Sequence, residues 1–301
     1  MNMNCHNLKV VAIEEDNIMK KVLVTGATGF IGNYVITELL KRDIEIIATS
    51  SNEEKAKQQL WFDDVKYIPF DFANFDSTSN YFLYFNEPDI LIHLAWEGLP
   101  NYTSSFHTEK NLPGHKALLE NLIKNGVNDI AITGTCLEYG IQEGCLSEDM
   151  TVLPSNRYAV AKNELRIFLE KLQQQYSFSF KWIRLFYMFG KGQNSNALLS
   201  QLDKAIQNGD TVFNMSGGEQ ARDYLPVSAV AEYIVKIALQ KNVDGIINCC
   251  SGIPITVREF VEQYLKATGK IVKLNLGYYP YTDYEPMHFW GSTEKLNKAL
   301  S

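Results

Sequence analysis

The sequence lacks an apolar segment long enough to cross a membrane, because no uninterrupted run approaches the ~20 residues that a spanning helix needs. Its first residues hold no long apolar stretch either, since Glu14, Glu15 and Asp16 interrupt the short one, so no secretory signal is predicted. Basic residues are outnumbered, with 28 Lys and Arg against 35 Asp and Glu. The net charge of −7 argues against a nucleic-acid partner but leaves room for a local basic pocket that binds a small anion.

Cysteine is too sparse for a disulfide framework. The five positions are Cys5, Cys136, Cys145, Cys249 and Cys250. No pair has CxxC spacing and the five His are equally scattered, so no metal site is predicted. Scattered reduced thiols are typical of a cytoplasmic protein. With 19 Gly, 9 Pro and a hydrophobic fraction of 46%, the chain is neither fibrous nor disordered, and 301 residues suffice for a large core.

Short apolar runs alternate with amphipathic stretches through the first half of the chain. Strands are predicted at 21–24, 44–48, 65–68, 90–94 and 129–133, and helices at 31–40, 53–60 and 111–124. Strands without polar alternation must be covered on both faces, as in a parallel sheet flanked by helices. The second half is less regular, with helices at 157–174, 198–206, 227–239 and 257–265 and strands at 180–186 and 246–250. The pattern predicts an α/β doubly wound domain followed by a smaller lobe.

A glycine-rich turn, Thr25 to Gly32, follows the first strand and opens the first helix. A dinucleotide pyrophosphate binds backbone N–H groups at a helix N-terminus, where no side chain is in the way. Gly26, Gly29 and Gly32 meet that need, and the strand before and the helix after are both present, as the motif requires. The predicted cofactor contacts in this turn are Gly26, Thr28, Gly29, Phe30, Ile31 and Gly32.

Tyr158 and Lys162 form the second motif. Four residues apart on a helix, their side chains share one face. An ammonium group near a phenol stabilises the phenolate, so that the tyrosine could exchange a proton near neutral pH instead of near ~10. The structural alternative is a tyrosine and a lysine on a solvated helix face.

The GxxGxxG spacing and the later YxxxK resemble the extended branch of the short-chain dehydrogenase/reductase superfamily, the NAD-dependent epimerase/dehydratase type that acts on nucleotide sugars. The resemblance covers about residues 20 to 270. It implies a Rossmann-type parallel sheet over residues 19–185 and a mainly substrate-binding lobe over 186–301, some segments of which return to the sheet domain. Residues 1–18 precede Met19, which would itself make an ordinary start, so they are expected to be either an appended extension or the product of a misassigned start. By position, it adds as cofactor contacts the adenine pair Asp71 and Phe72, the ribose-lining Leu94, Ala95 and Trp96, and Asn111.

The residues at the end of the second strand indicate whether NAD or NADP is preferred. NAD-specific members of the family carry a carboxylate there for the ribose 2′-hydroxyl. This chain has Thr49, Ser50 and Ser51 instead, with no carboxylate before Glu53. Hydroxyl groups and the nearby Lys55 suit a 2′-phosphate, so NADP is predicted and NAD stays open.

The third catalytic member of the family is a Ser or Thr four residues before a Tyr-Gly pair, which places Thr135 in that role. Thr133 is the nearby competitor. The family's dehydratases carry an Asp-Glu pair directly after this position, whereas this chain has Cys136 and Leu137, which do not fit dehydration. The cysteine of the family's ring epimerases is expected at position 137, so Cys136 is one residue off and is interpreted as a packed side chain.

The substrate end departs from the family pattern, because Tyr187 replaces the usual Asn. Arg222 opens a segment resembling RDYxxV, in which the arginine grips a phosphate. The alternative for Arg222 is an internal ion pair with Asp223 or Glu219. The predicted substrate contacts are Tyr187, Asn196 and Arg222.

Together with the family resemblance, these motifs imply an NADPH-dependent oxidoreductase that reduces the 4-keto group of a nucleoside-diphosphate 4-keto-6-deoxyhexose, with a dTDP sugar as the expected substrate. Such a nucleotide-sugar 4-ketoreductase serves deoxysugar and lipopolysaccharide O-antigen biosynthesis. Thr135 would orient the carbonyl, Tyr158 supply the proton and Lys162 lower its pKa. The alternatives are a C4 epimerase with tightly bound NAD and a non-catalytic regulatory protein that binds NAD(P). Helices 111–124 and 156–174 carry apolar residues on more than one side, and the family resemblance implies that such helices pair across a two-fold axis into a homodimer. The nucleotide and the product stereochemistry at C4 stay open.

Overall fold

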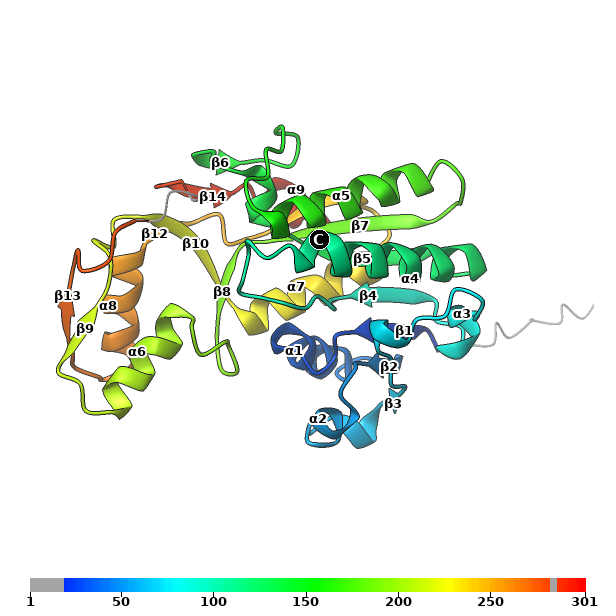
Figure 1. Cartoon of the computed structure of the whole chain (residues 1–301), viewed down its shortest axis with the longest axis horizontal. Coiled ribbons are helices and arrows are strands. Elements are labelled where there is room, and N and C mark those ends of the chain that lie inside the picture. Colours follow the sequence, from blue (N-terminus) through cyan, green and yellow to red (C-terminus); the bar gives the residue numbers. More distant parts are fainter. Residues whose placement is uncertain (1–18, 282–285) are drawn as a thin grey trace, which may run out of the picture.

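The computed structural model describes residues 19–281 and 286–301; the extension expected at 1–18 lies outside the described residues. Seven parallel strands form the central sheet (Figure 1), in the order β11-β7-β5-β4-β1-β2-β3. Their bounds are β1 Lys21–Thr25, β2 Glu45–Thr49, β3 Lys66–Tyr67, β4 Ile90–His93, β5 Asp129–Thr135, β7 Ser179–Leu185 and β11 Gly245–Cys249. The order reverses between β1 and β4, and ligands of open α/β sheets bind in the crevice at such a switch point.

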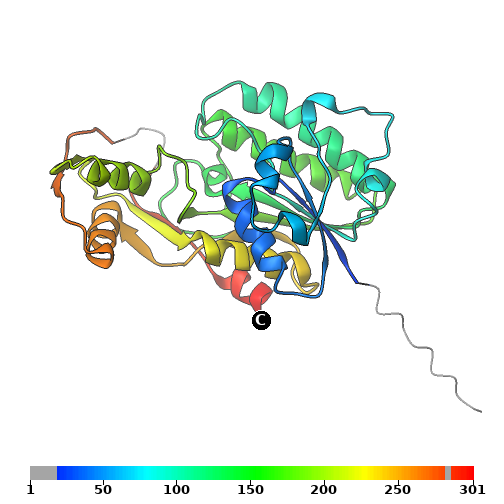
Figure 2. The ribbon, with the colours of Figure 1, turned by 90° about the horizontal axis from the view of Figure 1, so that it is seen from below.

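Helices cover both faces of this sheet (Figure 2), which explains the near-continuous apolar strands. Along β1, Val22 and Val24 pack on one side and Leu23 on the other. The first side is covered by α1 (Phe30–Leu39), α7 (Val227–Leu239) and α9 (Glu294–Leu300), and the second by α3 (Tyr81–Tyr84), α4 (Leu112–Asn125) and α5 (Arg157–Leu172). The predicted doubly wound α/β fold is confirmed.

The smaller lobe extends from the carboxyl ends of the strands (Figure 1). It contains α6 (Leu198–Gln207) and α8 (Val257–Thr268), a sheet of β8 (Tyr187–Phe189), β10 (Ala221–Pro226) and β12 (Pro254–Thr256), and the pair β9 (Val212–Asn214) and β13 (Lys273–Asn275). A further pair, β6 (Gly144–Leu146) and β14 (Phe289–Gly291), joins distant segments. The boundary predicted at residue 185 falls at the end of β7, and α7, β11 and α9 come after it yet pack on the large sheet.

Most predicted elements agree with the structure to within two or three residues. The helix predicted at 53–60 is shorter, because α2 spans Glu53–Lys57. The chain turns after it to bury Trp61, whose indole N–H donates to Asn33 of α1 at 2.8 Å. Among the described helices, none combines the length and apolarity that crossing a membrane requires.

Candidate active site

The turn from β1 into α1 has the form that a dinucleotide pyrophosphate needs. Gly26 has φ +70°, and a Cβ there would lie 2.8 Å from the backbone nitrogen of Ala95. A Cβ on Gly32 would lie 2.2 Å from the carbonyl oxygen of Gly26. The N-cap of α1 is Gly29, which has no side chain to cap the first N–H groups. The backbone is therefore close-packed where the motif predicts, and its N–H groups remain at the helix N-terminus for a phosphate.

A cavity of about 390 Å³ opens beside this turn. Its lining includes residues predicted for both the cofactor and the catalytic set: Gly26, Gly29, Phe30, Ile31, Gly32, Leu94, Trp96, Thr135, Tyr158 and Tyr187. The glycine turn, the segment predicted to line the ribose, the threonine and tyrosine predicted to be catalytic and one predicted substrate residue thus share one space. The residues present fit an NAD(P) cofactor, which would supply or take the hydride when bound.

Other predicted cofactor residues lie outside the cavity lining. Asp71 caps a short 3-10 turn by accepting from the N–H of Ala73, and Phe72 packs on His115, 4.3 Å between ring centres. Asn111 is buried and its amide donates to the carbonyl of Glu97 at 2.8 Å. In this structure Asn111 therefore fixes the loop after β4, and it sits at the end of a π-helical turn (His107–Asn111) just before α4.

Hydroxyl groups gather at the end of β2, as predicted for cofactor selection. Thr49 is buried, and the Ser50 hydroxyl lies 3.0 Å from the hydroxyl of Tyr67. Ser51 is exposed beside α2, on which Lys55 is also exposed. The exposed hydroxyl and the ammonium group are thus the groups at hand for a 2′-phosphate.

Tyr158 and Thr135 meet at the floor of the cavity. Asn156 begins α5 by accepting from the N–H of Ala159 at 2.9 Å, and Tyr158 lies in the first helical turn with its own N–H bonded to the carbonyl of Tyr102. Thr135 ends β5, and its hydroxyl is within hydrogen-bonding reach of the Tyr158 phenol. The competitor Thr133 is buried behind the cavity, with its hydroxyl 3.4 Å from the carbonyl of His93. The geometry favours Thr135 over Thr133.

Lys162 lies one helical turn after Tyr158 and is fully buried. Its ammonium group donates to the carbonyl of Thr133 at 2.9 Å and stands 4.1 Å from the Trp96 ring centre. Burial lowers the pKa of Lys162 to about 7, although the charge of Glu138 raises it. Burial raises the pKa of Tyr158, with smaller upward contributions from Tyr102 and Glu138. The lowering of the phenol pKa expected from Lys162 is therefore not found: burial of the ring raises this pKa, and the hydrogen bond with Thr135 is what lowers it.

The predicted substrate residues lie at different depths. Tyr187 lines the cavity together with Gln193 and Asn194, whereas Asn196 is exposed outside the lining. Arg222 is buried behind Tyr187, and it donates to the carbonyls of Ala221 at 2.9 Å and Met287 at 3.0 Å. Its neighbour Asp223 accepts from Ser251 and Gly252.

The sequence interpretation missed several lining residues. Leu99, Pro100 and Tyr102 come from the loop after β4, Phe186 directly follows β7, and Met188 lies in β8. No motif marks them, but both segments follow carboxyl ends of parallel strands, which is where the site of such a sheet is found.

Residues 22–250, well over half of the chain, match the family described as "NAD dependent epimerase/dehydratase family". The chain belongs to this family. The predicted resemblance to extended short-chain dehydrogenases/reductases is thereby confirmed.

Relatives in the family carry several activities. The chain is 27% identical over 283 residues to dTDP-6-deoxy-L-talose 4-dehydrogenase (NAD(+)) of Aggregatibacter actinomycetemcomitans, covering 90% of this chain and 99% of the relative. It is 24% identical over 253 residues to dTDP-4-dehydro-6-deoxyglucose reductase of Escherichia coli, covering 80% and 79%. The structure of UDP-glucuronic acid 4-epimerase from Bacillus cereus, in complex with UDP-glucuronic acid and NAD, shares the fold with a TM-score of 0.80 at 21% identity, over 93% and 92% of the two chains.

Proposed function

We propose that this family member modifies nucleotide sugars and specifically reduces the 4-keto group of a nucleoside-diphosphate 4-keto-6-deoxyhexose, most plausibly a dTDP sugar. The observation that carries the proposal is the shared cavity: the glycine turn, Thr135 and Tyr158 all line it. Two relatives whose names describe oxidation or reduction at C4 of a 6-deoxyhexose support the choice of reaction. A role in deoxysugar and lipopolysaccharide O-antigen biosynthesis follows from that substrate class.

In this proposal the chain's own residues orient the substrate and supply its proton. The Thr135 hydroxyl holds the 4-keto oxygen next to the Tyr158 phenol, and Tyr158 donates its proton to the alkoxide formed at C4. Lys162, whose ammonium group donates to the carbonyl of Thr133, would supply positive charge on the helix face that carries Tyr158. Because burial raises the Tyr158 pKa, the tyrosine is held in the protonated form that donates.

The proposal is tested by supplying purified protein with dTDP-4-keto-6-deoxyglucose and NADPH and following the near-ultraviolet absorbance of the reduced nicotinamide. A reductase consumes one NADPH for each sugar converted. A C4 epimerase with tightly held NAD would convert a 4-hydroxy sugar with no added reductant. A regulatory protein would bind the dinucleotide and consume none.

We expect a preference for NADPH over NADH, because the end of β2 offers hydroxyl groups and Lys55 but no carboxylate before Glu53. Kd values for both cofactors measure it. Ser51→Asp places a carboxylate at the exposed position and should shift the preference toward NADH by repelling a 2′-phosphate. Equal or tighter binding of NADH by the unaltered protein would contradict the preference.

Activity is expected to fall as the pH rises through about 7, because Lys162 has its pKa lowered to about 7 and carries its charge only below it. A pH profile of kcat/KM shows this as a descending limb. Lys162→Arg keeps a guanidinium that stays charged far above this range, so the limb should disappear whatever the absolute rate. The same limb in both proteins would rule out Lys162 as its source.

A homodimer is proposed as well. Helices α4 and α5 lie side by side on one face of the sheet (Figure 1), and the outward Ile167 of α5 is 36% exposed. Apolar positions on an outer helix face suit pairing of these helices across a two-fold axis. Light scattering at micromolar concentration should give twice the chain mass of 34.2 kDa, and a monomer mass would overturn the assignment.

We also propose that the protein is cytoplasmic, on the basis of its cysteine residues. The described cysteines, Cys136, Cys145, Cys249 and Cys250, form no disulfide with one another. Unlinked thiols of this kind suit a reducing compartment.

A further inference from the structure

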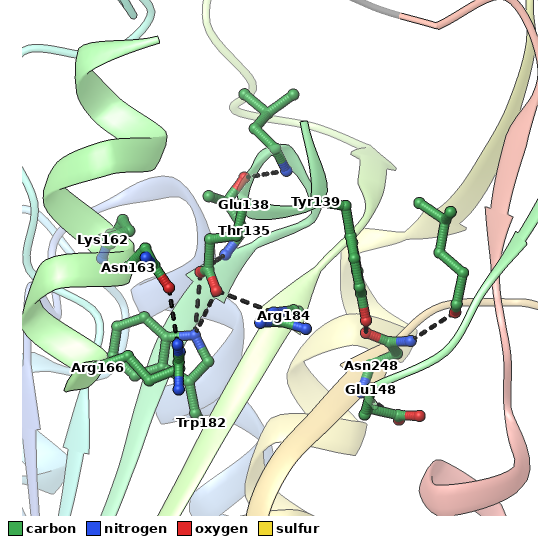
Figure 3. Close-up of polar contacts among 12 residues, drawn as sticks. Thr135, Glu138, Tyr139, Glu148, Lys162, Asn163, Arg166, Trp182, Arg184 and Asn248 are labelled. Atoms are coloured by element: carbon green, nitrogen blue, oxygen red, sulfur yellow. Dashed lines mark hydrogen bonds and ion pairs between the residues drawn. The ribbon is translucent and has the colours of Figure 1, made fainter. Parts of the chain in front are cut away.

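Glu138 places a carboxylate directly behind the candidate active site, three residues after Thr135 and fully buried. One carboxylate oxygen accepts from the backbone N–H of Thr135 at 2.9 Å, and the other accepts from Nε of Arg184 at 2.9 Å. The indole N–H of Trp182 is 3.0 Å from both oxygens (Figure 3). With both oxygens occupied and no place in the cavity lining, Glu138 is not a catalytic acid or base.

Stability alone does not account for this arrangement. Arg184 is also fully buried, and its guanidinium carbon is 4.4 Å from the Tyr139 ring centre. Burial lowers the pKa of Arg184, but the charge of Glu138 and hydrogen bonds to Glu138 and Tyr139 raise it above its ordinary value. A buried ion pair loses the hydration of both ions, and an apolar pair of similar volume is often at least as stabilising.

The contacts of Glu138 bear on the backbone and the hydroxyl of Thr135. The Thr135 hydroxyl accepts from the N–H of Leu137 at 3.3 Å while the Glu138 carboxylate accepts from the N–H of Thr135, so the two ends of the turn hold each other. The residue before Thr135 is Gly134, where a Cβ would lie 2.2 Å from the Trp182 indole nitrogen and 2.5 Å from the Glu138 carboxylate. The Trp182 indole and the Glu138 carboxylate therefore pack directly against the backbone at the end of β5.

We propose that Glu138, held by Trp182 and Arg184, is a positioning residue that fixes the Thr135 hydroxyl next to Tyr158. The effect on turnover rests on the proposed function, whereas the effect on the conformation of Thr135 does not. Figure 3 shows the network running from the end of β5 to Trp182 and Arg184 on β7, beside the helix that carries Lys162. The negative charge of Glu138 also favours the protonated forms of Tyr158 and Lys162, by raising the pKa of each.

The first test replaces both ions by apolar side chains, as Glu138→Leu with Arg184→Met, which leaves no buried charge behind. If the pair only stabilises the fold, this double variant keeps its activity. If Glu138 positions Thr135, kcat falls by about 10-fold while the KM for the nucleotide sugar changes little. In a Thr135→Ala background, with each variant assayed at its own pH optimum so that shifted pKa values of Tyr158 and Lys162 do not enter, the same two substitutions should cost no further activity, because the hydroxyl that they position is already absent. An equal loss in both backgrounds would overturn the proposal.

Lys181→Met is the matched control, since Lys181 is a buried cation on the same strand at its other end. It pairs with Asp129 at 2.5 Å, and Asp129 also contacts Lys241, so that the carboxylate keeps a partner. This variant should lower the melting temperature without changing kcat. Trp182→Phe supplies a second route if the double variant does not fold. It removes the N–H donor together with part of the buried ring and keeps every charge, and it should lower kcat less, again only when Thr135 is present.

A second measurement does not depend on turnover. In the wild-type protein the Thr135 amide should exchange slowly with deuterium and its methyl group should give one sharp NMR signal. In the Glu138→Leu/Arg184→Met variant, or in Trp182→Phe, the amide should exchange about 10-fold faster and the methyl signal should shift or split, while the signals of Thr133 stay in place. Unchanged Thr135 signals would overturn the positioning role. Wild-type protein that is inactive on 4-keto sugars would instead overturn the proposed function, and the NMR result would still decide on Glu138.

Discussion

Replacing Tyr158 by phenylalanine is expected to lower kcat by at least ~10²-fold, the usual loss when a general acid is removed. The substitution keeps the ring, which contacts Trp96, Tyr102 and His107 at 6.0, 5.6 and 5.4 Å between ring centres. Cofactor and nucleotide-sugar binding should therefore change little. Steady-state kinetics with Kd values from titration separates the two effects.

Companion variants test whether the loss belongs to this hydroxyl. Lys162→Met should be comparably damaging, because it removes the buried positive charge, and Thr135→Ala should be milder, because Thr135 orients and does not transfer the proton. Tyr264→Phe removes a phenol hydroxyl that contacts Asp203 in the smaller lobe, and it should leave kcat unchanged. Near wild-type turnover by Tyr158→Phe would remove the catalytic assignment and favour a protein that binds a dinucleotide without reducing a sugar.

Gly26→Ala should abolish detectable cofactor binding while the protein stays folded. The new Cβ would lie 2.8 Å from the nitrogen and 2.9 Å from the Cα of Ala95, and the residue would hold φ +70°. The turn must shift to relieve this contact, which moves the N–H groups away from the pyrophosphate. Equilibrium titration with NADPH and NADH measures the loss.

Gly209→Ala separates backbone strain from close approach. Gly209 has φ +82°, close to that of Gly26, but a Cβ there would meet nothing within 4 Å. Both variants therefore incur a left-handed penalty of about 1–2 kcal/mol, and only Gly26→Ala disturbs the cradle. If Gly26→Ala binds the cofactor as tightly as Gly209→Ala does, the turn is not the pyrophosphate site.

The fold was predictable because its signals are local. The apolar strand Lys21–Thr25, the glycine turn after it and the helical spacing of α1 occur within twenty residues, and each agrees with the others. The three-residue strands β6 and β14 carry no such signal. Residues 144–146 pair with residues 289–291, and so short a pairing depends on distant parts of the chain.

In the candidate site, too, the residues related by local spacing were predictable, and those brought together by strand pairing were not. Tyr158 and Lys162 lie one helical turn apart and Thr135 lies four residues before Tyr139, so these spacings, read with the family resemblance, predict all three. The contact between Glu138 and Arg184 depends on the register of β5 against β7, in which Gly134 pairs with Arg184. The register of two strands cannot be derived from the sequence alone, so the sequence analysis did not identify Glu138.

The pKa values of Tyr158 and Lys162 depend on how deeply both side chains are buried, which the sequence does not reveal. An ammonium group beside a phenol predicts a lowered phenol pKa, whereas the structure buries both groups and directs the Lys162 donor to the carbonyl of Thr133. Spacing on a helix face cannot reveal how much water is lost, and that loss sets both pKa values here.

Reduction at C4 is tested most directly by following the hydrogen atom that is transferred from NADPH to the sugar. The protein is incubated with dTDP-4-keto-6-deoxyglucose and NADPH that carries deuterium at the transferable position, and the product is analysed by NMR. If the protein is a 4-ketoreductase, we expect deuterium at C4 of a 4-hydroxy-6-deoxyhexose, with one NADPH oxidised for each molecule formed. Recovery of the unchanged 4-keto sugar with no NADPH oxidised would contradict it.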